Sequence, residues 1–265
     1  MSRWETIGAT KERDTDFVQS LERGLAVLRS FDAEHPTLTL SDVARLTGLT
    51  RATARRLLLT FEQLGYMSYD GKLFQLTPKV LDLGYAYLSS VQIGEIAQPA
   101  MEALSEKVHE SVSASVLDGH EIVYVARVPT KRIMTIALAL GSRLPAASTS
   151  MGRVLLADLT DDDVRALLAT APPRPLTERT ITDAVTLLEA LVEVRRQGWA
   201  LVDQELEDGV RSVAAPLRDR RGRAVAAINV STHAGRVSLK ELRSDVLPHL
   251  LDTASEISDR LRRRG

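Results

Sequence analysis

The sequence predicts an α+β protein with an N-terminal winged helix-turn-helix, a linker helix, and a C-terminal domain built on a six-stranded antiparallel sheet flanked by helices. Three observations lead to this fold class. Two short helical patterns separated by a glycine turn stand directly before a hairpin pattern, as in a winged helix-turn-helix. The apolar period then changes from 3.6 residues to 2 at residues 111–116. Strand patterns recur after an intervening helical stretch, which is typical of an antiparallel sheet covered by helices.

The bulk composition narrows the class of protein. A length of 265 residues favours two domains, and 44% apolar with 26% charged residues is ordinary for a globular chain. Cysteine is absent, which excludes disulfides and thiolate zinc sites and fits a reducing cytoplasm. No apolar run approaches the ~20 residues of a membrane span. Residues 1–16 are polar and acidic, unlike a signal peptide, so we expect a flexible arm on a cytoplasmic protein.

The first expected elements are helices. Apolar residues recur with a helical period over Phe17–Phe31, and Pro36 breaks the pattern that follows. A short amphipathic helix over Leu40–Leu46, capped by Ser41, leads into a tight turn at Gly48. These segments correspond to the first two helices of a helix-turn-helix.

The second helix of the motif and the hairpin after it are also predicted from short sequence signals. Thr50 is expected to cap the next helix, and Gly65 to end it. Two strand-like pieces, residues 66–69 and 73–76, flank Asp70-Gly71, a strong hairpin signal. The combination predicts a winged helix-turn-helix, the alternative being a helical cap with an incidental hairpin.

The basic residues of this segment point to DNA. The formal net charge is −1, yet four arginines and no acid lie between residues 43 and 61. Such a stripe suits a DNA-reading element, the alternative being a solvated helix face. The start of the second helix contacts base edges in a helix-turn-helix complex. The candidates for base contacts are Thr50, Arg51, Thr53 and Arg55, and those for phosphate contacts are Arg56, Lys72 and Lys79, with Arg45 the weakest candidate.

The rest of the chain alternates between helix and strand. The expected helices are Lys79–Ser90, Ile93–Val108, Gly152–Asp158, Thr160–Ala169, Thr182–Gln197 and a long last helix from Leu239 to Leu261, bent at Pro248. The expected strands are Ser111–Val116, Ile122–Val128, Ile133–Leu140, Trp199–Asp203, Ser212–Leu217 and Ala224–Ser231. The domain boundaries follow: an arm at 1–16, the winged helix-turn-helix at 17–78, the linker helix at 79–91 and the C-terminal domain at 92–265.

One loop of the C-terminal domain has the composition of an anion site. Residues 148–152 are small and rich in hydroxyl groups, and they lead into a helix. Backbone N–H groups at a helix N-terminus bind carboxylates readily, although an ordinary capping loop has the same composition. Asn229 and Ser231 lie two residues apart, so they face the same side of their strand.

Several stretches of the chain resemble the IclR family of bacterial transcriptional regulators. The stretch LTLSDVARLTGLTRATARRLLLTFEQLGY (38–66) resembles its helix-turn-helix, and SLERGLAVLRSF (20–31) its leader. The stretches LPAASTSMGRVLLA (144–157), GWALVDQELEDGVRSVAAPL (198–217) and AVAAINVST (224–232) resemble its effector-binding domain. YVARVPTKRIM (124–134) is similar to the branch that regulates aromatic-acid catabolism, including protocatechuate, p-hydroxybenzoate and β-ketoadipate pathway genes.

The resemblance implies a small carboxylate effector, aromatic or aliphatic, and indicates where it binds. The implied effector-binding residues are Ser150, Met151, Asp203, Ser212, Asn229 and Ser231, with Met134 and Leu144 as an apolar wall. Ser212 stands where family members can carry cysteine, and Met151 where they can carry a smaller residue, which leaves the ligand's size open. Asp203 would repel an anion, so it either accepts from a ligand hydroxyl or lies away from the carboxyl end.

The sequence also bears on partners and on catalysis. We expect operator DNA, the effector, and a second copy of the chain, as a homodimer or a tetramer built from two dimers, with no membrane partner. None of the five histidines has metal-site spacing, and nucleotide-binding and nucleophile-elbow motifs are absent, so we expect no enzyme, cofactor or metal. The alternatives are a hydrolase-type enzyme with a triad assembled in space, and a protein-interaction module on the wing fold.

Overall fold

The protein consists of two compact units in the computed structural model, residues 1–87 and 88–265, and each is described separately. The structure describes residues 17–85, 93–130 and 138–264. The expected arm at 1–16 and the expected effector residue Met134 lie outside these ranges. None of the helices within the described ranges is long and apolar enough to cross a membrane.

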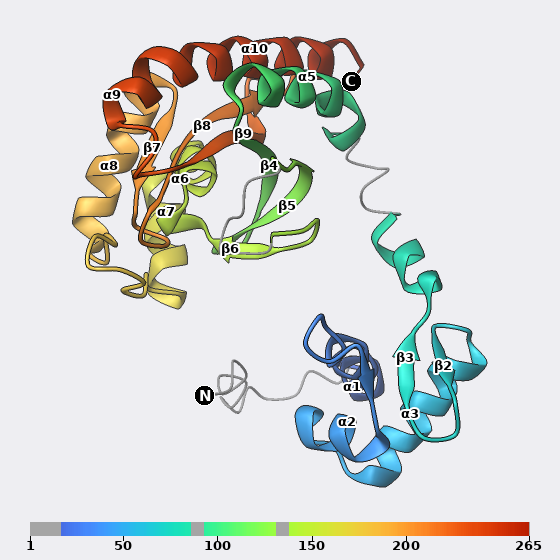
Figure 1. The fold of residues 1–265 in the computed structure, drawn as a ribbon. Coiled ribbons are helices and arrows are strands. Elements are labelled where there is room, and N and C mark those ends of the chain that lie inside the picture. Colours follow the sequence, from blue (N-terminus) through green and yellow to red (C-terminus); the bar gives the residue numbers. More distant parts are fainter. Residues whose placement is uncertain (1–16, 86–92, 131–137, 265) are drawn as a thin grey trace. The chain divides into compact units, whose positions relative to one another are not determined.

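The first unit is a winged helix-turn-helix, as the sequence predicts (Figure 1). Its elements are α1 (Gln19–Arg29), β1 (Thr37–Leu38), α2 (Leu40–Thr47), α3 (Arg51–Gln63), β2 (Met67–Tyr69) and β3 (Phe74–Leu76). The three strands form a sheet in the order β1-β3-β2, with β3 pairing antiparallel to both neighbours. Strand β1 is not predicted from sequence, because two residues are too few to show an alternating pattern.

The caps of the two central helices fix where each begins. The prediction that Ser41 caps α2 is wrong, because Thr39 occupies the N-cap. The Thr39 hydroxyl accepts from the Asp42 N–H, and the Asp42 carboxylate accepts from the Thr39 N–H, each at 3.2 Å. The prediction that Thr50 caps α3 is confirmed: its hydroxyl accepts from the Thr53 N–H at 3.2 Å.

A single small core joins these elements. Its fully buried members come from α1, α2, α3 and the hairpin, and they include Val27, Val43, Ala54, Leu58, Met67 and Phe74. After the hairpin, Pro78–Val80 forms a 3-10 turn and residues 81–85 are helical. This agrees with the start of the expected linker helix, whose remaining residues 86–91 are not described.

The second unit is built on the expected six-stranded antiparallel sheet, in the order β6-β5-β4-β9-β8-β7. The strands are β4 (Ser111–Asp118), β5 (Glu121–Val128), β6 (Arg143–Pro145), β7 (Ala200–Asp203), β8 (Val210–Arg218) and β9 (Ala224–His233). Of the third expected strand, Ile133–Leu140, residues 133–137 lie outside the described ranges. Residues 138–140 are not strand, and the strand that pairs with β5 is Arg143–Pro145, through the register Ile122 to Leu144.

Helices cover both faces of this sheet (Figure 1). One face packs on α5 (Ile93–Val108) and α10 (Leu247–Arg264), and the other on α6 (Ser150–Ala157) and α8 (Ala184–Gln197). The remaining helices are α7 (Asp161–Thr170) and the short α9 (Leu239–Glu241). A π-helical turn at Leu242–Val246 stands just before Pro248, where the sequence predicts a bend.

The N-terminus of α6 is set by a close approach of two backbone segments. The helix begins at Ser150, two residues earlier than predicted, because Thr149 is its N-cap and accepts from the Gly152 N–H at 3.1 Å. A 3-10 turn at Ala146–Ser148 leads into it. A β-carbon on Gly152 would overlap the Ala146 backbone, so this contact requires glycine.

We expect Gly152→Ala to lower the free energy of unfolding of the C-terminal unit by about 1–3 kcal/mol, because the added methyl group forces α6 and the preceding turn apart. Chemical denaturation followed by circular dichroism measures the change. Gly94→Ala is the matched control, since its β-carbon would only touch the Val125 carbonyl oxygen at an ordinary 3.5 Å. Equal stability of the two variants would contradict the backbone contact.

Candidate functional site

The first turns of α3 present a polar, basic surface. Thr50, Arg51, Arg55 and Arg56 are exposed, and Thr53 is half-buried. The Thr50 hydroxyl donates to the Thr53 hydroxyl at 2.9 Å, which orders both side chains at the helix start. The opposite side of the helix buries Ala54 and Leu58 in the core. The structure therefore brings together all five of the α3 residues expected to contact DNA.

The charges on this surface are not neutralised internally. Among residues 17–85, no ion pair or hydrogen bond engages the guanidinium groups of Arg51, Arg55 or Arg56. Arg45 differs, because it forms an ion pair with Asp42 at 3.3 Å. The same Asp42 belongs to the α2 capping box, and the Thr39 hydrogen bonds lower its pKa. Arg45 is therefore paired within its own helix, unlike the arginines of α3.

The tip of the wing is an ordered turn with one exposed cation. The Asp70 carboxylate accepts from the N–H groups of Leu73 and Lys72, at 2.7 and 2.8 Å, and these two bonds lower its pKa. The Tyr69 and Phe74 rings stack at 4.2 Å beneath the turn. The Lys72 side chain is exposed at the tip, where a phosphate contact would need it.

Lys79, the other predicted phosphate contact, lies elsewhere. Its ammonium group donates to the Leu64 carbonyl at the C-terminus of α3, at 2.9 Å, and lies 5.1 Å from the centre of the Tyr66 ring. A lysine at a helix C-terminus satisfies an otherwise unpaired carbonyl group. The structure therefore gives Lys79 a capping role that the sequence does not reveal.

The second site is a polar cluster between the sheet and the N-terminus of α6. Cross-strand register places Ser113 opposite Asn229, and Ser231 opposite both Ser111 and Ser212. Directly opposed residues of antiparallel strands point to the same face, so these side chains share the face covered by α6. We call the following residues the polar cluster: Ser113, Ser115, Ser150, Ser212, Asn229 and Ser231.

Helix α6 contributes directly to this cluster. The hydroxyl oxygens of Ser150 and Ser212 lie 2.8 Å apart, and the Ser115 hydroxyl donates to the sulfur of Met151 at 3.2 Å. Ser150 and Met151 are each only 1% exposed. The structure therefore brings together Ser150, Met151 and Ser212, which come from distant parts of the chain, as the sequence analysis expects.

Asn229 is the amide side chain of the polar cluster. It is 4% exposed, and its amide nitrogen donates to the Ser231 hydroxyl at 3.0 Å. Its Oδ1 atom is buried and has no hydrogen-bond partner among the described residues. A buried unpaired acceptor is costly, and such atoms in native proteins mark strain, function or a missing ligand.

Two other expected effector residues lie outside the polar cluster, Asp203 on the opposite face of the sheet and Leu144 among apolar residues. Asp203 pairs across the strands with Arg211, whereas Val202 pairs with Ser212, so Asp203 points to the opposite face from the cluster. Its carboxylate also forms ion pairs with Arg211 at 2.9 Å and Arg179 at 3.2 Å. Leu144 lies opposite Ile122 and packs with the apolar residues beside α6, as an apolar wall would.

Two residues on this face are not identified from sequence. Arg127 lies directly opposite Ser113, is half-buried, and has no ion pair within the described ranges. Tyr124 lies opposite Ser115, and burial raises the pKa of its hydroxyl to about 12. A β-bulge between Ala114 and Ser115 puts both on the α6 face, and strict alternation would have separated them.

A buried ion pair holds the turn before α6. Arg153 and Glu205 are nearly inaccessible to solvent and bond to each other through their charged groups. The Arg153 Nε–H also donates to the Ala147 carbonyl at 3.0 Å, and the Glu205 carboxylate accepts from the Ile181 N–H at 3.1 Å. The pair therefore connects the start of α6 to the loop between β7 and β8.

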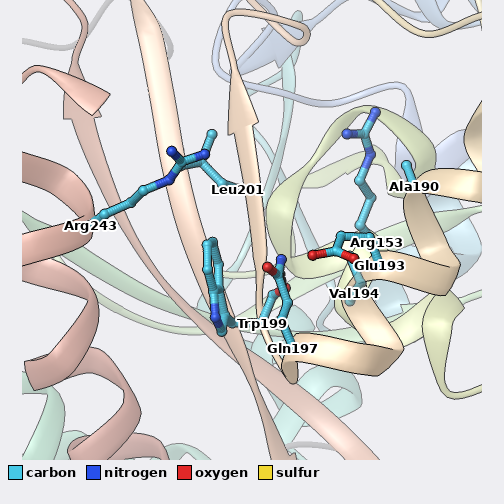
Figure 2. Close-up of a pocket in the computed structure, with 8 residues that line it drawn as sticks. All are labelled: Arg153, Ala190, Glu193, Val194, Gln197, Trp199, Leu201 and Arg243. Carbon is cyan, nitrogen blue, oxygen red and sulfur yellow. Dashed lines mark hydrogen bonds between the residues drawn. The ribbon is translucent and has the colours of Figure 1, made fainter. Parts of the chain in front are cut away.

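A shallow cleft of about 250 Å³ lies near this pair (Figure 2). It is lined by Arg153, Ala190, Glu193, Val194, Gln197, Trp199, Leu201 and Arg243. None of the effector residues expected from sequence lines it, so it is separate from the polar cluster. No group of three metal-binding side chains occurs within the ranges that the structure describes.

Comparison with known proteins defines the class of this chain. Residues 20–71 match the model for the IclR helix-turn-helix domain, and residues 85–259 match the model for the bacterial transcriptional regulator IclR C-terminal domain. The fold and these two matches define a DNA-binding transcriptional regulator. The chain belongs to the IclR family. Its families and relatives are regulators, so the enzyme alternative receives no support.

Two similar relatives are regulators named for the pca regulon and for p-hydroxybenzoate hydroxylase. The Pca regulon regulatory protein of Pseudomonas putida is 44% identical, over 94% of this chain and 86% of the relative. The p-hydroxybenzoate hydroxylase transcriptional activator of Acinetobacter baylyi is 37% identical, over 92% of each chain. These matches agree with the branch that residues 124–134 indicate.

Solved structures agree with the family. A Rhodococcus sp. RHA1 regulator is 57% identical, with a TM-score of 0.83 over 92% of this chain and 98% of that one. The inducer-binding domain of PobR from Acinetobacter, a double mutant solved with 3-hydroxybenzoic acid, is 36% identical. Its TM-score is 0.59, over 62% of this chain and 96% of that one.

Proposed function

We propose that this regulator binds operator DNA as a homodimer and that a small carboxylic acid, bound at the polar cluster, changes its operator affinity at genes of aromatic-acid catabolism. The observation that carries the DNA-binding part is the α3 surface. It presents two hydroxyl side chains and three arginines whose charges have no partner in residues 17–85. Arginine can bridge guanine O6 and N7, and threonine can contact a base edge or a thymine methyl group.

We expect Arg51→Ala to cost about 1–3 kcal/mol of operator binding and to relax base preference, because it removes a base contact. Lys72→Ala should weaken binding to all duplexes alike and flatten the salt dependence, because it removes a phosphate contact. Fluorescence anisotropy with operator and random duplexes at several salt concentrations measures both effects. Arg45→Ala is the control, since Arg45 is paired with Asp42. Wild-type behaviour of both test variants would contradict this docking.

Exposed apolar side chains support the homodimer. Leu21 and Leu25 follow one stripe of α1, and Leu81 and Tyr85 one stripe of the linker helix. Leu81 is 73% exposed and Leu21 63%, which is unusual for large apolar side chains on consecutive helical turns. A second copy of the chain would cover them, and a two-fold dimer would match a pseudo-palindromic operator.

We expect light scattering at micromolar concentration to give at least a dimer, because the uncovered leucines gain from burial in a second protomer. Leu81→Asp should shift the assembly toward smaller species, since it places a charge in that contact. Leu176→Asp serves as the control, because Leu176 is an exposed leucine of the other unit. A wild-type chain that stays monomeric would disprove this part of the proposal.

The polar cluster supports the effector. The N–H groups of Ser150 and Met151 open helix α6, and neither has an acceptor in the described part of the chain. Backbone N–H groups at a helix N-terminus, with the hydroxyls of Ser150 and Ser212 beside them, form a donor set suited to a carboxylate. Arg127, which has no ion pair within the described residues, lies on the same face and adds another donor.

We expect protocatechuate, p-hydroxybenzoate, β-ketoadipate or pyruvate to change operator affinity by roughly 5–150-fold, the usual range for allosteric coupling. The effector must bind two arrangements of the protein unequally, because equal binding shifts no equilibrium. Ser150→Ala should reduce the response in operator-binding titrations. Ser244→Ala is the control, an exposed serine outside the polar cluster. If none of the acids alters DNA binding, the effector proposal fails.

A further inference from the structure

We infer that the effector carries a hydroxyl group as well as its carboxylate, and that Asn229 accepts the hydrogen bond from that hydroxyl. The ligand class is then a hydroxylated aromatic acid rather than a keto dicarboxylic acid. The inference rests on the proposed function, because it concerns the same polar cluster. It goes further by assigning a specificity-determining atom, Oδ1 of Asn229.

The starting point is the unfilled acceptor. Asn229 is 96% buried by area, its amide nitrogen is used by Ser231, and its Oδ1 atom has no partner among the described residues. A buried carbonyl oxygen of this kind gains a hydrogen bond only when a donor enters the site. An amide oxygen cannot receive a hydrogen bond from a ligand that offers acceptors alone.

Several of the neighbouring hydroxyl groups are already engaged, and no hydroxyl of the described residues bonds to the Asn229 Oδ1 atom. Ser150 and Ser212 bond to each other, and Ser115 donates to the sulfur of Met151. On the β8 side, the cross-strand neighbour of Asn229 is Ala214, which has no polar side chain. The polar cluster therefore leaves the Asn229 acceptor open to a ligand.

The two ends of the site have opposite character. The α6 end offers backbone N–H groups, which only donate, and serine hydroxyls, which can donate, so it suits the carboxylate. The Asn229 end offers an acceptor, which a second carboxylate or a ketone would repel and a hydroxyl would satisfy. The sequence analysis leaves Asp203 open as the acceptor of a ligand hydroxyl. In the structure, Asp203 lies on the opposite face and forms ion pairs with two arginines. Of these two candidate acceptors, Asn229 is therefore the one on the face of the polar cluster.

Arg127 can donate a hydrogen bond to the same ligand hydroxyl that donates to Asn229. It lies in one row with Ser113 and Asn229, about two strand spacings or ~10 Å from Asn229, which its long side chain can partly span. A guanidinium only donates, whereas a phenolic hydroxyl both accepts and donates. A phenol could therefore accept from Arg127 while it donates to Asn229, and a dicarboxylate could serve only Arg127.

Calorimetry on the full chain with a matched ligand series tests the inference. The probes are 4-hydroxybenzoate, 4-methoxybenzoate, benzoate and adipate. The methoxy compound keeps the ring, the acid and the acceptor oxygen but loses the donor. We expect 4-hydroxybenzoate to bind at least ~10-fold more tightly than the other three, since a site that pairs with a hydroxyl strongly rejects analogues lacking it.

The Asn229→Leu variant removes the acceptor at nearly constant volume. It should bring 4-hydroxybenzoate down to the affinity of benzoate and leave benzoate binding unchanged. Arg143→Gln is the control, since Arg143 is an exposed arginine engaged with Asp118 and Glu121 away from the cluster. If Asn229→Leu does not fold, the wild-type comparison of the hydroxy and methoxy acids decides alone.

The outcomes distinguish a failure of the hydroxyl assignment from a failure of the effector proposal. Equal binding of 4-hydroxybenzoate and 4-methoxybenzoate, or tightest binding of adipate, would overturn the hydroxyl assignment while the effector proposal stands. Retained preference for 4-hydroxybenzoate in Asn229→Leu would move the acceptor to another residue and also overturn it. Binding of no acid, together with unchanged operator affinity, would overturn the proposed function itself.

Discussion

The close approach of α6 to the turn before it is the constraint on which the C-terminal site depends. Only glycine at position 152 lets the backbone of Ala146 lie against the first turn of the helix. The Arg153–Glu205 pair and the Thr149 cap hold the same turn from two other directions. Together they hold the N-terminus of α6 against the polar cluster of the sheet. The donors of α6 and the acceptor of Asn229 are therefore held in fixed positions, and the proposed effector would meet an ordered site at a lower entropy cost.

Much of the fold could be predicted because its signals are local. The turn at Gly48, the cap at Thr50 and the hairpin at Asp70-Gly71 each depend on a few neighbouring residues, and all three occur as expected. Strand β6 could not be located in this way. An edge strand of three residues takes its position from pairing with β5, which is a tertiary contact, and no alternation within three residues marks it.

The candidate site was predictable only in part, for the same reason. Asn229 and Ser231 share a face because both lie in one unbroken strand, so the period of two is enough. The face of Asp203 depends on its register with Arg211, and the face of Arg127 depends on a bulge in the neighbouring pair. A bulge reverses the alternation beyond it without leaving a mark in the apolar pattern. The α3 surface, by contrast, follows from helical periodicity alone.

The bonds at the end of α3 have a mechanical consequence. Lys79 holds the Leu64 carbonyl, and the Thr77 hydroxyl holds that of Gly65 at 2.6 Å, so the first linker residues are fastened to the last turn of the recognition helix. The Thr77 N–H also donates to the Tyr66 carbonyl at 3.0 Å. A rotation of these linker residues is then transmitted to α3 through the hydrogen bonds that join them. A small rotation of these linker residues would therefore displace the exposed arginines of α3.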